Sequence, residues 1–134
     1  MRKLFFLLTT LTILCGFACQ EKKSTTSFEN TTWQLKLLTT EGTTQAVPAD
    51  VVITATFKDG KLAGNGGCNS YSATYTLIGT RLSLGPVMST KMSCPANMVE
   101  SRYFSTLRGD MVWKVNGNKL TIEGPGVVLV YEKP

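Results

Sequence analysis

Apolar and polar residues alternate along most of the chain after residue 30, as they do in strands that bury one face. Trp33, Leu35 and Leu37 are separated by polar residues and are expected to face the core together. The pattern recurs at 53–57, 71–77, 82–84, 111–115 and 120–122, and a run rich in β-branched residues follows at 127–131. We therefore predict a mainly β (α+β) domain, a small meander sheet or barrel of about seven or eight short antiparallel strands.

Turn signals that contain glycine separate the alternating segments. Asp-Gly at 59–60 and Asn-Gly at 116–117 lie between alternating runs, where tight hairpin turns need positive φ. The glycines at 64–67 match neither a dinucleotide fingerprint nor a phosphate loop. We expect them to allow a bulge or a positive φ where the strand turns.

One stretch shows helical spacing instead of alternation. Its apolar stripe consists of Ala96, Val99, Tyr103 and Leu107, widened by Phe104. Pro95 suits the first helical position, and Asn97 with Glu100 offers a capping box as an alternative start. Gly109 suits the C-terminal stop. One inserted helix is therefore predicted near 96–108, covering an open face or end of the sheet.

The N-terminal segment has the pattern of an export signal. Arg2 and Lys3 precede an apolar run at 4–14, and Ala18 comes directly before Cys19. The run is too short to span a bilayer, which needs about 20 residues, so the pattern indicates a signal peptide. It is similar to bacterial lipoprotein signals, which implies that Cys19 is acylated. The alternative is ordinary cleavage near Ala18, which would leave Cys19 as an unpaired thiol.

This interpretation divides the chain into three parts. A lipoprotein-type signal peptide occupies 1–18, a polar, flexible tether occupies 19–27, and one domain occupies 28–134. We expect a lipid-anchored protein of the bacterial cell envelope. Gln20 after the acylated Cys favours the outer membrane over the inner one.

Composition limits the chemistry that the chain can perform. Its 134 residues are 43% apolar and 17% charged, with a net charge of +5, which suits one small domain. The absence of His removes the commonest general base and zinc ligand. Lys and Arg form no stripe, which favours a solvated surface over a nucleic-acid site. We predict no enzyme activity, no metal and no cofactor.

Cys68 and Cys94 are the two cysteines of the predicted domain. In an exported domain such a pair is expected to form a disulfide, which would stabilise the fold by about 3.5 kcal/mol in the chain-entropy model. A reactive thiol pair lacks support, because the spacing is not CxxC and no His lies nearby. A metal site has even less support, because two Cys fall short of the four ligands that a structural zinc site needs.

Two short motifs surround these cysteines. A G-C-N-x-Y motif is formed by Gly67, Cys68, Asn69 and Tyr71, and a T-[RK]-M-x-C motif by Thr90, Lys91, Met92 and Cys94. Together with Trp33, they resemble the META domain family, which includes heat-shock lipoproteins of the HslJ type. The resemblance runs from about residue 28 to 133. It implies a compact β-rich domain with one helix, no established catalytic activity, a link with stress responses, and the pairing of Cys68 with Cys94.

The resemblance also marks a set of candidate binding residues: Asn69, Tyr71, Thr90, Lys91 and Met92. Structural roles are the simpler interpretation for three of them. We expect Asn69 to stabilise the glycine turn through its side chain, Met92 to fill the core and Lys91 to be solvated. The aromatic residues Trp33, Tyr71, Tyr75, Tyr103 and Trp113 could line a cavity, but we expect them to form the core.

Three functions remain open from the sequence. The favoured one is a non-catalytic, stress-related interaction module that binds an envelope protein. The alternative is a carrier, in which the barrel encloses a small apolar ligand or lipid, as the similarity of the family fold to lipid-binding pilot lipoproteins implies. A thiol oxidoreductase ranks third. A monomer is expected in each case.

Overall fold

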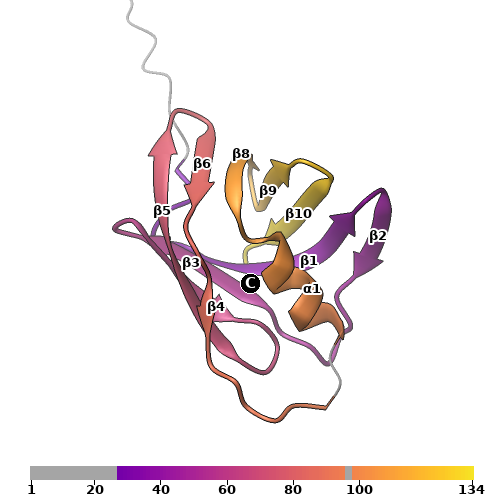
Figure 1. Cartoon of the computed structure of the whole chain (residues 1–134). Helices are drawn as coiled ribbons and strands as arrows, with labels where there is room; N and C mark the ends of the chain where they lie inside the picture. The colour runs from indigo at the N-terminus through magenta and orange to yellow at the C-terminus, as the bar shows by residue number, and fades with distance from the viewer. Residues whose placement is uncertain (1–26, 96–97) are drawn as a thin grey trace, which may run out of the picture.

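Eight antiparallel strands close into a barrel in the computed structural model, which describes residues 27–95 and 98–134 (Figure 1). The barrel strands are β1 (Thr32–Thr40), β3 (Thr54–Lys58), β4 (Lys61–Asn65), β5 (Ser70–Ile78), β6 (Arg81–Leu84), β8 (Gly109–Asn116), β9 (Lys119–Gly124) and β10 (Val127–Glu132). Each pairs with the next along this order, and β10 pairs back to β1. The predicted mainly β fold is confirmed. The predicted signal peptide and most of the tether lie outside the described residues.

Two short strands lie outside the closed barrel and were not predicted. The strand β2 (Thr43–Ala46) pairs with the end of β1, and β7 (Met88–Ser89) pairs with β5. Glu41 and Gly42 form the β1–β2 turn with positive φ of 50° and 78°. No Asn-Gly or Asp-Gly marks this turn, and β2 has no buried face to give it an alternating pattern.

A bulge in β1 corrects the predicted core face of that strand. The pairing of β1 with β10 shifts register between Leu35 and Leu37. Leu38 is therefore fully buried, and Leu37 is 38% exposed. The expectation that Leu37 faces the core with Trp33 is wrong, because the extra residue of a bulge turns the following side chains to the other face.

The helix α1 (Met98–Thr106), the one helix among the described residues, is shorter than the predicted segment at 96–108. Its stripe of Val99, Tyr103 and Leu107 is buried as expected, while Ala96 and Asn97 lie outside the described residues. The helix ends three residues before Gly109, which has a φ of 70° and is the first residue of β8. The expectation that Gly109 stops the helix is wrong: it begins the next strand.

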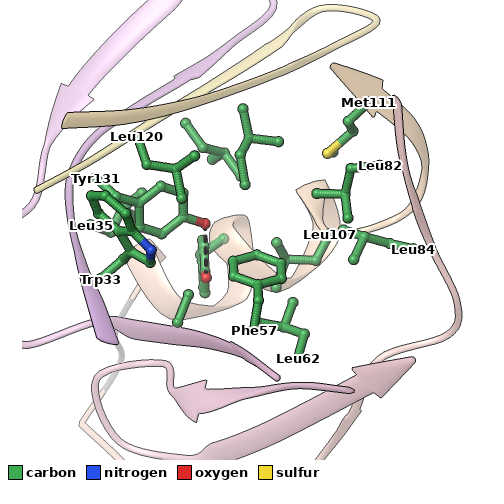
Figure 2. Packing of buried hydrophobic residues seen from close by; sticks show 14 of the residues in the cluster. Trp33, Leu35, Phe57, Leu62, Leu82, Leu84, Leu107, Met111, Leu120 and Tyr131 are labelled. Atoms are coloured by element: carbon green, nitrogen blue, oxygen red, sulfur yellow. Dashed lines mark hydrogen bonds between the residues drawn. The ribbon is translucent and has the colours of Figure 1, made fainter. Parts of the chain in front are cut away.

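The side chains of the chain itself fill the barrel (Figure 2). The predicted core aromatics Trp33, Tyr71, Tyr75, Tyr103 and Trp113 are all at most 9% exposed. Phe28 closes one mouth: its ring centroid lies 4.7 Å from those of both Phe57 and Trp113. Every buried side-chain nitrogen or oxygen in the described residues has a hydrogen-bond partner.

The strand connections define two ends of the barrel. The hairpin end carries Phe28, the β3–β4, β5–β6 and β8–β9 turns, and the C-terminus. The clamped end carries the β4–β5 turn, the β6–α1 connection, α1 and the β9–β10 turn. Figure 1 shows the β5–β6 turn and the β6–α1 connection at opposite ends of the molecule.

Candidate functional site

Residues 85–95 form the clamped loop, which connects β6 through β7 to α1. A disulfide joins Cys94 in this loop to Cys68 in the β4–β5 turn, with 6.3 Å between the Cα atoms. The predicted disulfide is therefore present. It fixes a long connection directly to the barrel, next to both sequence motifs.

The side chain of Asn69 ties three segments together. Its Oδ1 accepts hydrogen bonds from the Met92 backbone N–H (2.8 Å) and the Thr90 hydroxyl (2.9 Å). Its Nδ2 donates to Oε1 of Glu100 at 2.6 Å. The glycine turn is instead stabilised by Asn65, whose Oδ1 accepts from the Gly67 N–H at 2.7 Å. The expected turn-stabilising role thus belongs to the side chain of Asn65.

Glu100 is the buried carboxylate of the site, and the sequence did not single it out for this role. Its Oε2 accepts hydrogen bonds from the backbone N–H groups of Cys68 (2.8 Å) and Asn69 (2.7 Å). Burial raises its pKa, but the hydrogen bonds from the Asn69 side chain and from the two backbone N–H groups outweigh burial and leave the pKa lowered. The sequence signal that could have indicated a buried role for Glu100 is its position directly after Val99, in the buried stripe of the helix.

A row of buried tyrosine hydroxyls continues from the site into the barrel. The Tyr71 hydroxyl lies 2.7 Å from that of Tyr103, which lies 3.0 Å from that of Tyr131. Tyr71 donates its proton to the Thr54 carbonyl. Each hydroxyl has one proton, so Tyr103 donates to Tyr71 and Tyr131 donates to Tyr103. Burial raises the pKa of all three phenols well above the usual value.

The clamped loop exposes two methionines and a lysine. Met88 is 70% exposed and Met92 is 58% exposed, and Lys91 is also exposed. The expectation that Met92 fills the core is wrong, because its backbone is drawn to Asn69 and its side chain points outward. The expectation of a solvated Lys91 is confirmed.

Two open clefts flank these exposed side chains. One, of about 310 Å³, is lined by residues of β5 and by Met88, Ser89 and Thr90. The other, of about 360 Å³, is lined by Lys91, Met92 and residues of α1 that include Phe104. Of the five candidate binding residues, Asn69, Tyr71 and Thr90 are therefore committed to internal hydrogen bonds, and Lys91 and Met92 face solvent.

The polar groups of the site are engaged with one another and hold the surface in place. Its buried carboxylate accepts three internal hydrogen bonds, and its cysteines are joined. Within the described part of the chain, no three Cys, Asp or Glu side chains gather as a metal site requires. The same part of the chain contains no helix with the length and apolarity of a bilayer-spanning segment.

By its fold, this protein is a closed β-barrel with one packed helix. Comparison with known proteins gives its family. A model of the META domain matches residues 26–134, so the chain belongs to the META domain family. No curated protein matches the sequence significantly.

Solved structures share this barrel. A protein from Burkholderia xenovorans, determined by NMR, is similar with a TM-score of 0.66 and 25% identity over 79% of this chain and 83% of that one. A second NMR structure has a TM-score of 0.62 and 21% identity, over 78% and 90%. A lipocalin-like protein from Bacteroides uniformis has a TM-score of 0.52 and 20% identity, over 78% and 96%. The last two show the fold alone.

Proposed function

We propose that this META domain is a non-catalytic interaction module of a stress-related envelope lipoprotein of the HslJ type, and that the clamped loop is its binding surface. The observation that carries the proposal is the exposure of Met88 and Met92 on a loop fixed by the disulfide and by Asn69. Loops held on a rigid scaffold often carry binding residues. Methionine adapts its shape to a partner, and a fixed loop loses little entropy on binding.

The carrier function receives less support from the same structure. Trp33, Tyr103 and Tyr131 are fully buried inside the barrel, together with the leucines around them. A carrier of an acyl chain would need this volume for its ligand. The two clefts beside the clamped loop open at the surface and are flanked by polar side chains.

Site-specific crosslinking tests the proposed binding surface. A photoreactive amino acid replaces Met92, and the control replaces Val52, which is 52% exposed on the β2–β3 connection. The proposal predicts one discrete adduct in intact cells from position 92 and none from position 52. Lys91→Glu, placed beside the crosslinker, should abolish that adduct without lowering the thermal midpoint. The same adduct from both positions, or none from position 92, would refute the proposal.

Mass spectrometry tests the anchor independently. The proposed lipoprotein should yield a mature N-terminal peptide that begins at Cys19 and carries acyl chains. Cys19→Ser should release the protein from the outer-membrane fraction. An unmodified N-terminus at another residue would contradict the anchoring proposal and leave the crosslinking result unaffected.

A further inference from the structure

The folded domain has a charge asymmetry that the sequence conceals. Six of the ten Lys and Arg side chains in residues 27–95 and 98–134 lie at the hairpin end, and all six are exposed. They are Lys58, Lys61, Arg81, Lys114, Lys119 and Lys133. Only three of the eight Asp and Glu in the same residues share this end: Glu29, Asp59 and Glu132. Scattered cations thus gather because three hairpin turns and the C-terminus meet at one rim.

Exposed apolar side chains lie among these cations. Ile78, at the β5–β6 turn, is 74% exposed, and Val112 on β8 is 55% exposed. Ile78 pairs with Arg81 across the turn, and Arg81 pairs with Val112. The outer surface of this rim therefore carries Ile78, Arg81 and Val112 in one row, which ends on β9 at Glu123, the partner of Val112. Exposed apolar side chains beside cations are found where proteins contact lipid headgroups.

The N-terminal segment joins the domain at this same end. Phe28 is fully buried against Phe57 and Trp113, and the Trp33 Nε1–H donates a hydrogen bond to its carbonyl oxygen at 2.8 Å. The point of attachment is therefore fixed. The nine residues at 19–27 can extend by at most about 30 Å, so an anchor at Cys19 would hold the hairpin end near the bilayer.

We propose that the hairpin end is a membrane-contacting surface that lies against anionic lipid headgroups, with Ile78 in the interfacial region. This orientation rests on the proposed acylation of Cys19. Lys and Arg are attracted to anionic lipid, and the short tether raises the effective concentration of the surface at the bilayer. The clamped loop, at the opposite end, then faces away from the membrane, where an envelope partner can reach it.

Paramagnetic NMR on the full chain, purified from envelopes and incorporated into lipid discs, tests this surface. Discs of phosphatidylglycerol are compared with discs of phosphatidylcholine, each doped with a headgroup-labelled paramagnetic lipid. The variant Ile78→Ser/Arg81→Glu changes the hairpin end. The matched control Met92→Ser/Lys91→Glu makes the same two kinds of change on the clamped loop.

The proposal predicts strong relaxation of the β5–β6 and β8–β9 turn amides in anionic discs, and little at the clamped loop. The hairpin-end variant and added salt should remove this effect, and the control variant should keep it. Equal relaxation at both ends, or equal effects in the two lipids, would overturn the proposal. Mass spectrometry separates failure of the anchor from failure of the proposed surface, because an absent anchor shows as a missing acyl mass on Cys19. The comparison of the two lipids tests the surface itself, because a lipid anchor alone does not distinguish anionic from neutral discs.

Discussion

At the scale of single residues, the site depends on one carboxylate that organises its surroundings. Glu100 accepts hydrogen bonds from Asn69 and Cys68 and thereby holds α1 against the β4–β5 turn. Hydrogen bonds to a charged acceptor are stronger than neutral ones, and breaking them in a buried site leaves donors unsatisfied. Gly66 belongs to the same arrangement, because a Cβ there would lie 2.4 Å from the Phe104 ring and 2.9 Å from Glu100.

Replacing Glu100 by Gln should lower the free energy of unfolding by about 1–3 kcal/mol, because an amide cannot accept all three hydrogen bonds. Chemical denaturation measures the change, and Glu123→Gln, at an exposed carboxylate, is the control.

The pH dependence of stability tests the same carboxylate. The lowered pKa of Glu100 means that its ionised form stabilises the fold at pH values above the ordinary pKa of 4.5. That contribution is lost as the pH falls through the lowered pKa, so the loss on acidification should be smaller in the variant. An identical acid profile in the two proteins would contradict this role.

The four tyrosines of the chain should resist ionisation together. Burial raises the pKa of Tyr75 to about 12, helped by its hydrogen bond to Glu29, and raises the others further. The folded chain should therefore show almost no phenolate absorbance near pH 10, where about half of the tyrosines of the unfolded chain are ionised. Because these pKa values are raised, stability present below that pH is lost as the pH rises toward the folded values. Gradual titration of even one tyrosine near pH 10, with the fold intact, would show an exposed phenol.

At the scale of elements, glycines decide where strands can approach each other. Gly64→Ala would place a Cβ 2.0 Å from the Thr54 carbonyl oxygen, a backbone atom that cannot move aside alone. We expect a loss of more than about 2 kcal/mol in the free energy of unfolding. Gly79→Ala is the matched control: its φ is 60° and nothing lies within 4 Å, so only backbone strain of about 1–2 kcal/mol is expected. A Gly64→Ala loss no larger than the control would refute the close approach.

The elements also show what sequence patterns can and cannot predict. Alternation predicted six of the eight barrel strands because each buries one face, while a run of β-branched residues predicted β10 and only the Asp-Gly turn pointed to β4. The stripe of Val99 and Tyr103 predicted α1. The pattern missed the bulge before Leu37, because a bulge depends on pairing with β10 rather than on local composition. It missed β2 and β7, because these strands carry no buried face.

At the scale of the whole molecule, the site assembles segments that are distant in sequence. The export signal and the family resemblance predicted the disulfide between Cys68 and Cys94. The hydrogen bond from Thr90 to Asn69 was not predicted, because Asn69 was expected to stabilise the glycine turn. The two motifs did not predict Glu100, which reaches the site from α1 through a helix placement that the motifs do not encode. The cationic rim was equally hidden, because only barrel closure brings three turns together.

The disulfide clamps the loop and α1 to the barrel in one fixed surface. The most direct test is chemical denaturation of the oxidised chain beside Cys68→Ser/Cys94→Ser, with amide hydrogen exchange recorded on both. We expect the double variant to lose about 3.5 kcal/mol of the free energy of unfolding, and to exchange faster at 85–95 and in α1 while β8–β10 stay protected. Equal stability and equal exchange in the two proteins would show that the disulfide does not fix the loop and α1 to the barrel.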